Sequence, residues 1–95
     1  MKFNEWSMER IRRGTKTITS RKKKHLNDPD VLYVFGPLPW WVIRDYLYIQ
    51  EGAESPEELQ EVIDKIFARR GYPVADDEVF YVHVIETISV QMKSK

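Results

Sequence analysis

The chain has 95 residues, of which 42% are hydrophobic and 32% are charged, and its formal net charge is zero. This composition predicts one globular domain, residues 1–95, and argues against a disordered chain. The absence of cysteine excludes disulfides, a thiolate nucleophile and a cysteine-bound zinc ion. No apolar run reaches the length of a membrane span and the first residues lack a signal-peptide core, so we expect a cytoplasmic protein without a membrane partner.

The charges are unevenly distributed along the chain. Residues 1–25 contain nine Lys or Arg and two acidic residues, whereas residues 26–95 contain six basic and thirteen acidic residues. A basic face of this kind favours phosphates and nucleic acid through attraction that does not depend on sequence. The same charges could instead neutralise one another once the chain folds.

The first third predicts a helix, a strand and a loop. Asn4 or Ser7 can cap a helix over residues 3–14, whose last residue, a glycine, suits the position after the helix end. The β-branched residues 15–21 predict a strand. The lysine-rich residues 22–30 predict an exposed loop.

The middle of the chain predicts two further strands. Residues 31–35 are an apolar run typical of a buried strand, which the Gly-Pro-Leu-Pro segment at 36–39 interrupts. Residues 40–49 are aromatic and β-branched, and they predict a central strand.

The last third contains the clearest local signal. Ser55 followed by Pro56 and Glu58 forms a capping box, and apolar residues continue at helical spacing as far as Gly71. Residues 78–90 alternate between apolar and polar side chains and predict a long final strand. The whole order predicts an α+β fold, a small curved sheet or β-barrel with two main helices packed on its outside.

Residues 14–21, Gly-Thr-Lys-Thr-Ile-Thr-Ser-Arg, concentrate hydroxyls and cations on one short stretch. Arg21 offers a planar fork suited to phosphate or carboxylate, and a lysine near a threonine can form a base and a nucleophile. In a flat strand Lys16 and Thr19 point to opposite faces, so they cooperate only if Lys16 lies in the turn after Gly14 or if the strand bends. The alternative is an ordinary threonine-rich strand with a solvated face.

Other candidate residues lie outside this stretch. Glu51, between a predicted strand and a helix cap, is a candidate general acid or base, or simply a turn residue. Trp40 and Trp41 would face opposite ways on a strand, one filling the core and the other offering a stacking surface for a base. The alternative for both is core filling or a contact with a partner. The basic residues 21–25 could bind phosphates or form a solvated loop. Two histidines are too few to predict a metal site.

The combination of motifs resembles the ASCH domain family. A helix carrying Phe3 and Trp6, then G-x-K-T-x-T-x-R, then Glu-Gly-Ala-Glu-Ser-Pro-Glu-Glu-Leu at 51–59 and a terminal strand occur in the family's order. The resemblance implies a PUA-like β-barrel that binds RNA, a nucleoside or a nucleotide. We expect no cofactor and a monomer. We expect the following residues to contact the ligand: Thr17, Arg21, Lys22, Lys23, Trp40 and Trp41.

The resemblance also implies an alternative function. Some small ASCH proteins are amidohydrolases that remove the acyl group from N4-acetylcytidine. By position, their catalytic residues correspond to Lys16, Thr19 and Glu51, with Glu54 as a rival for the acidic position. Thr19 would attack the amide carbonyl, Lys16 would take or shuttle its proton, and Glu51 would assist the leaving amine.

Overall fold

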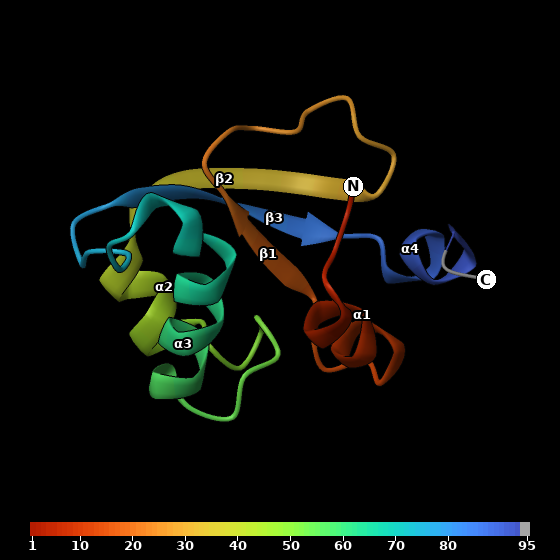
Figure 1. The fold of residues 1–95 in the computed structure, drawn as a ribbon. Coiled ribbons are helices and arrows are strands. Elements are labelled where there is room, and N and C mark those ends of the chain that lie inside the picture. Colours follow the sequence, from red (N-terminus) through yellow and green to blue (C-terminus); the bar gives the residue numbers. More distant parts are fainter. Residues whose placement is uncertain (94–95) are drawn as a thin grey trace.

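In the computed structural model, which describes residues 1–93, three strands form one antiparallel sheet. β1 (Ile18–Arg21) and β2 (Val31–Pro39) flank β3 (Val79–Ile85), so the last strand of the chain is the central one (Figure 1). This sheet with helices around it confirms the predicted α+β class. A closed barrel is not seen in residues 1–93, so that finer prediction stays a prediction.

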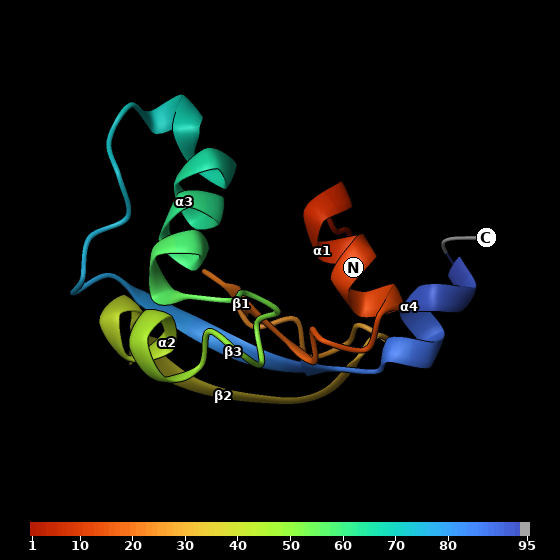
Figure 2. The same cartoon turned by 90° about the horizontal axis from the view of Figure 1, so that it is seen from below.

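Within the described residues there are four α-helices rather than the two predicted. Figure 2 shows α1 and α3 on the same side of the sheet, with α4 beyond the end of β3. None of these helices is both long and apolar enough to span a membrane. The helices, with one short 3₁₀ helix, are α1 (Glu5–Arg12), α2 (Trp40–Tyr46), α3 (Pro56–Ile66), η1 (Ala68–Arg70) and α4 (Thr87–Lys93).

The two predicted helices begin at predicted caps. The Asn4 side-chain oxygen accepts a hydrogen bond from the Ser7 backbone N–H (2.8 Å), and the Ser55 hydroxyl accepts one from the Glu58 backbone N–H (3.1 Å). The Glu58 carboxylate in turn accepts from the Glu54 backbone N–H (2.8 Å). The bonds to Ser7 and Glu58 each satisfy an N–H group that has no partner inside its helix.

The first two strands differ in length from the prediction. β1 begins at Ile18, three residues later than predicted, and residues 15–17 instead connect α1 to the sheet. β2 continues past residue 35 to Pro39, and its register against β3 shifts between Phe35 and Leu38. Residues 22–30 contain neither helix nor strand, as predicted.

The predicted central strand over residues 40–49 is wrong, because this segment begins with α2. Trp40 and Ile43 are fully buried while Trp41 is exposed, which is helical rather than strand spacing. Two backbone carbonyls from the segment before β3 accept hydrogen bonds from the first N–H groups of α2. Side-chain packing and these bonds outweigh the strand propensity of aromatic and β-branched residues.

The predicted final strand over residues 78–90 is also wrong in its second half, because β3 ends at Ile85 and α4 follows. Val90 on α4 packs with Ile11 on α1, and the Gln91 side-chain amide donates to the Ile11 carbonyl (3.0 Å). Packing against α1 therefore makes a helix of a β-branched segment.

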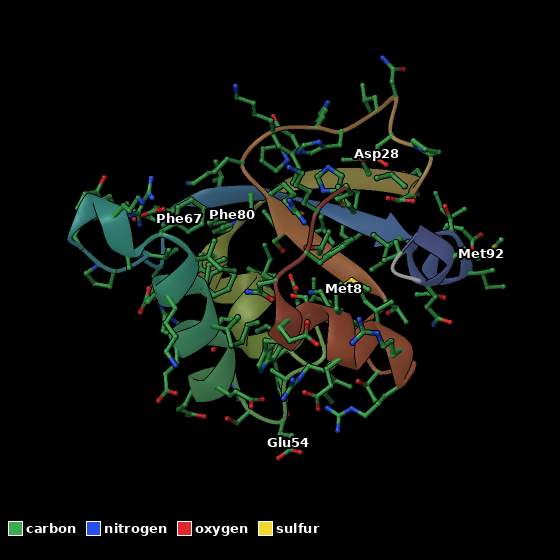
Figure 3. The ribbon with its side chains drawn as sticks, turned by 45° about the vertical axis from the view of Figure 1, so that its right-hand side comes forward. Met8, Asp28, Glu54, Phe67, Phe80 and Met92 are labelled. Carbon is green, nitrogen blue, oxygen red and sulfur yellow. The ribbon has the colours of Figure 1, made fainter. Side chains whose placement is uncertain are left out.

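The main core lies between the sheet, α2 and α3. Trp40 and Phe80 are its two largest fully buried side chains, and their ring centroids are 5.4 Å apart. Phe67 packs edge-on against Phe80 with a centroid distance of 6.1 Å (Figure 3). A second, smaller cluster joins α1 to α4. Trp40, Leu59 and Ile63 of the main core also border the cavity that forms the candidate site.

Candidate functional site

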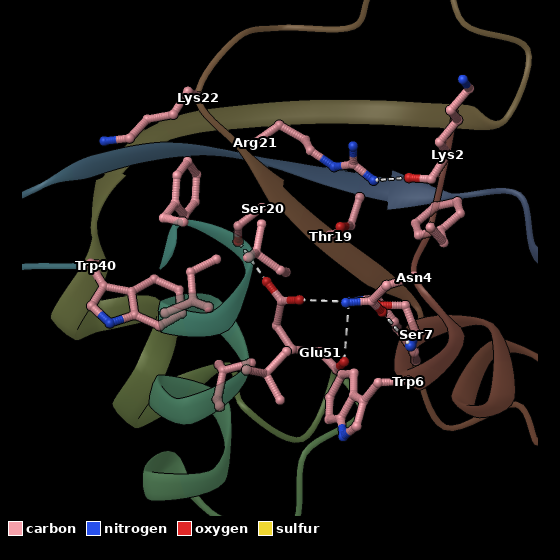
Figure 4. A pocket seen from close by; sticks show the side chains of 17 residues that line it. Lys2, Asn4, Trp6, Ser7, Thr19, Ser20, Arg21, Lys22, Trp40 and Glu51 are labelled. Carbon is pink, nitrogen blue, oxygen red and sulfur yellow. Dashed lines mark hydrogen bonds and ion pairs between the residues drawn. The ribbon is translucent and has the colours of Figure 1, made fainter. Parts of the chain in front are cut away.

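A cavity of about 320 Å³ lies between β1, α3 and the residues around the start of α1 (Figure 4). One wall is apolar and comes from α3, including Leu59, Val62 and Ile66, with Trp6 also lining the cavity. The polar lining comes mainly from β1 and the residues just before it. This size and mixture of surfaces are typical of a site for a small molecule.

A buried ion pair joins Lys16, just before β1, to Glu51, just before α3. The Lys16 Nζ donates to Glu51 Oε1 (2.7 Å) and to the Glu51 backbone carbonyl (3.2 Å), and the two residues are only 2% and 4% exposed. The Ser20 hydroxyl donates to the other carboxylate oxygen, Oε2 (2.5 Å). An ammonium group has three N–H donors, and two are used here, so one remains for a ligand.

The chain places Lys16 in the turn before β1. α1 gives way to Gly14, whose φ is +77°, and the Lys16 backbone N–H donates to the Arg10 carbonyl (3.3 Å). Because Lys16 precedes Ile18, the first residue of β1, the alternation of side chains along a flat strand does not separate it from Thr19. Both side chains border the same cavity.

Gly52 allows the segment that carries Glu51 to approach closely. Its φ is +97°, and a Cβ there would lie 3.0 Å from Lys16 Cβ and 3.1 Å from Arg10 Cδ. The Arg10 Nε donates to the Gly52 carbonyl (3.0 Å), and the Arg10 guanidinium stacks on Trp6 (3.9 Å to the ring centroid). A side chain at this position would therefore displace Glu51 from Lys16.

Thr19 supplies a hydroxyl that has no hydrogen-bond partner within the described residues. It is 6% exposed and lines the cavity, and no hydrogen bond among residues 1–93 uses its side-chain oxygen. In the view of Figure 4 it lies below the Arg21 guanidinium and above the Glu51 side chain. A hydroxyl without a partner beside a buried ion pair is available to a ligand.

The mouth of the cavity is basic. Lys2, Arg21 and Lys22 line it, and Lys22 is held by an ion pair with Glu78 (Nζ to Oε2, 3.1 Å). The Arg21 guanidinium donates to the Lys2 carbonyl (2.7 Å) and lies 5.2 Å from the centroid of the Phe3 ring. Burial lowers the pKa of Arg21, although Glu51 and Asp28 act in the opposite direction.

Several predicted ligand-binding residues lie elsewhere. Thr17, Lys23 and Trp41 are exposed and do not line the cavity, whereas Trp40 does so with a fully buried side chain. The exposed position of Thr17 follows from its place in the connection before β1, where its backbone N–H donates to the Gln50 carbonyl (2.9 Å).

The two candidate carboxylates are placed differently. Glu51 is buried against Lys16, whereas Glu54 is exposed and points away from the molecule (Figure 3). His83 is fully buried, and its Nε2 accepts from the His25 backbone N–H (3.0 Å). Among residues 1–93, no three His, Asp or Glu side chains are grouped so that they could hold a metal ion.

Sequence reasoning missed Ser20 and the apolar wall. The available signal for Ser20, which donates to Glu51, was its place in the hydroxyl-rich residues 14–21. Val62 and Ile66 look like the ordinary apolar face of an amphipathic helix, but Ile66 is 53% exposed, which is unusual for a core position.

The chain matches no family model, and comparison with curated proteins and with solved structures found no match either. The resemblance to ASCH domains therefore rests on the sequence motifs and stays a prediction.

Proposed function

We propose that the chain is an ASCH-type, PUA-like domain whose cavity binds a nucleoside-sized molecule and hydrolyses a small amide such as N4-acetylcytidine. The observation that carries this proposal is that the Lys16–Glu51 pair (Nζ to Oε1, 2.7 Å) and the unbonded Thr19 hydroxyl line one cavity of about 320 Å³. Burying an ion pair costs free energy, so a buried pair in the wall of a cavity favours a functional role over a purely stabilising one. The three residues are those that the ASCH resemblance assigns to catalysis.

The pair can move the protons that amide hydrolysis requires. Glu51 takes a proton from Lys16, and the resulting amine takes the proton of Thr19 as its oxygen attacks the carbonyl carbon. Glu51, now a carboxylic acid, protonates the leaving nitrogen as the carbon–nitrogen bond breaks. The ion pair is then restored, the amine is released, and the acyl group is held as an ester on Thr19.

The second half of the reaction uses the same groups. Water enters the cavity, gives one proton to the restored pair and attacks the ester carbonyl. The pair returns that proton to the Thr19 oxygen as the ester bond breaks, so that the carboxylic acid leaves and the free hydroxyl is regenerated. No group outside the cavity needs to donate or accept a proton.

The direct test is to incubate the purified protein with N4-acetylcytidine and to measure cytidine by chromatography. Thr19→Val keeps the shape of the side chain and removes the nucleophile, so turnover should fall by at least about 100-fold. Thr17→Val is the matched control, because Thr17 is exposed and lies outside the cavity. Turnover by Thr19→Val at the wild-type rate would refute the proposed role of this hydroxyl.

Binding of single-stranded RNA is a second candidate function, favoured by the exposed lysines that continue from the cavity mouth. Lys22, Lys23 and Lys24 are consecutive and exposed. Each phosphate contact that is lost lowers the slope of log affinity against log salt by about 0.7 for a single strand. Replacing all three lysines by glutamine should therefore lower the slope by about 2, and an unchanged slope would contradict RNA binding by this loop.

A further inference from the structure

Arg21 differs from the other arginines of the described chain. Five of them have a carboxylate within 4 Å: Arg10, Arg12, Arg13, Arg44 and Arg70. Within residues 1–93 only Arg21 and Arg69 have none, and Arg69 is exposed to water on η1. Arg21 is thus a partly buried guanidinium without a counter-charge in contact.

The structure holds Arg21 in place but leaves most of its donors unused. A guanidinium has five N–H donors, and the hydrogen bond to the Lys2 carbonyl (2.7 Å) uses one of them. The Phe3 ring, 5.2 Å from the guanidinium carbon, supports one side of the group. A supported planar fork is preorganised for two parallel bonds to an oxyanion.

The charges that line the cavity are not balanced. Glu51 neutralises Lys16, and Glu78, outside the cavity, neutralises Lys22. Among the described residues that line the cavity, Lys2 and Arg21 have no carboxylate in contact, although the charge of Glu51 acts on Arg21 from a distance. Burial lowers the pKa of Arg21, which indicates that its charged form is poorly solvated and would gain from a bound anion.

We propose that the cavity takes an anionic substrate, a planar amide that carries a phosphate or carboxylate group, and that Arg21 binds this group at the cavity mouth. This inference rests on the proposed function for the identity of the reacting amide. The planar part would lie among the apolar side chains of α3 and Trp6, with its amide at the Lys16–Glu51 pair. A mononucleotide would then bind better than the corresponding nucleoside.

The test measures binding by titration calorimetry, with cytidine, cytidine 5′-monophosphate and cytidine 5′-carboxylic acid as probes. A bidentate bond to a charged group should make the monophosphate bind about 10-fold tighter than cytidine or better. The carboxylic acid shows whether one charge in planar geometry suffices or whether phosphate is required. Equal affinities for all three probes would overturn the inference.

The variants separate a local contact from general charge. Arg21→Gln should abolish the preference for the monophosphate and change cytidine affinity by less than about threefold, while Arg21→Lys should keep part of the preference. Arg69→Gln removes the same charge from an exposed site and should leave the preference unchanged. An equal loss in Arg69→Gln would overturn the inference, because long-range attraction would then explain the preference.

Turnover distinguishes this inference from the proposed reaction. If Arg21→Gln slows hydrolysis of neutral N4-acetylcytidine as much as hydrolysis of its monophosphate, Arg21 acts on the reacting atoms and the inference is wrong. If the monophosphate binds tightly through Arg21 but no amide is hydrolysed, the inference stands and the amidohydrolase proposal fails.

Discussion

The Lys16–Glu51 pair and a network around Gln60 are two polar clusters of the same small molecule, and they use their hydrogen-bonding groups differently. The Gln60 network consists of Trp40, Arg44, Gln60, Asp64 and Val74. Gln60 Oε1 accepts from Trp40 Nε1 (2.7 Å) and from Arg44 (3.2 Å). Gln60 Nε2 donates to Asp64 Oδ1 (3.1 Å) and to the Val74 carbonyl (3.1 Å), so every donor and acceptor of the amide is used.

The cluster at the cavity is less complete. Lys16 uses two of its three donors, and the Thr19 hydroxyl, which lines the same cavity, has no hydrogen-bond partner within residues 1–93. Gln60, Asp64 and Val74 do not line the cavity, whereas Lys16, Thr19 and Glu51 do. The Gln60 network joins α2 and α3, and its amide has no hydrogen-bonding group free for a ligand. The Lys16–Glu51 cluster has free groups and lines the cavity. The comparison predicts that the first cluster serves stability and the second serves function.

The largest expected effect comes from breaking the Lys16–Glu51 pair. Glu51→Gln leaves the Lys16 ammonium buried without its counter-charge and should lower the free energy of unfolding by about 3 kcal/mol or more. The double variant Lys16→Met/Glu51→Gln removes both charges and should recover most of that stability. Turnover of N4-acetylcytidine should be lost in both variants. Urea unfolding and the hydrolysis assay measure the two effects.

A control for the pair is available on the exposed face of α3. Glu61 and Lys65 are exposed and one helical turn apart, and Lys65→Met/Glu61→Gln should change stability by less than about 0.5 kcal/mol. If Lys16→Met/Glu51→Gln is stable and still hydrolyses the amide, the pair is not catalytic. The proposed difference in role between the two clusters would then be wrong.

Gln60→Leu should give the opposite combination of effects. The substitution leaves Trp40 Nε1, the Val74 carbonyl and Asp64 with fewer partners, and we expect a loss of about 2 kcal/mol in the free energy of unfolding. Turnover per folded molecule should stay at the wild-type level. Gln50→Leu is the matched control, because Gln50 is exposed and no hydrogen bond to its side chain is present in residues 1–93. Loss of turnover without loss of stability in Gln60→Leu would reverse the proposed roles of the two clusters.

Elements of the fold that depend on neighbouring residues could be predicted from the sequence, whereas elements that depend on distant contacts could not. Ser55, Pro56 and Glu58 specify a helix start through bonds within four residues, and that prediction is confirmed. Residues 40–46 and 87–90 have strand-like compositions, but their contacts with distant segments make them helical. Local motifs were therefore sufficient at the caps and insufficient where long-range packing decides.

The polar residues of the candidate site could be predicted from local motifs, whereas its apolar wall could not. Lys16, Thr19 and Glu51 were named from motifs, and the structure brings all three to one cavity. The apolar wall could not be named, because Val62 and Ile66 follow the periodicity of any amphipathic helix. Their contribution depends on α1 and α3 standing apart on the same side of the sheet (Figure 2), which no local pattern specifies.

Gly52→Ala should displace Glu51 without changing any charge, so it tests whether turnover depends on the position of this carboxylate. The added Cβ would lie 3.0 Å from Lys16 Cβ in a backbone conformation that side chains disfavour, so we expect a loss of about 2 kcal/mol together with reduced turnover. Gly71→Ala is the matched control, since Gly71 has a similar φ of +78° but open space around it. It should cost about 1 kcal/mol and leave turnover intact. Equal effects on turnover in the two variants would mean that close packing at Gly52 does not position the acid.

The smallest expected effect concerns Glu78, whose carboxylate resembles the Gln60 amide in that each of its polar atoms is hydrogen-bonded. It accepts from Arg70 (2.6 Å), the Ala75 backbone N–H (3.1 Å) and Lys22 (3.1 Å), and the bond from Arg70 is the main cause that lowers the pKa of Glu78 to about 2 from its ordinary value of 4.5. Because the folded state holds the ionised form, this contribution is complete above pH 4.5 and is lost as the pH falls towards 2.

Glu78→Gln should therefore lower stability near neutral pH by about 1 kcal/mol and make unfolding less dependent on pH between 4.5 and 2. Glu61→Gln, on an exposed side chain, is the matched control and should leave stability near neutral pH within about 0.5 kcal/mol of the wild type. Glu78 does not line the cavity, so turnover of the neutral amide should not change. If Glu78→Gln instead abolished turnover while its stability matched the wild type, saturation of hydrogen bonds would no longer separate structural clusters from functional ones in this molecule.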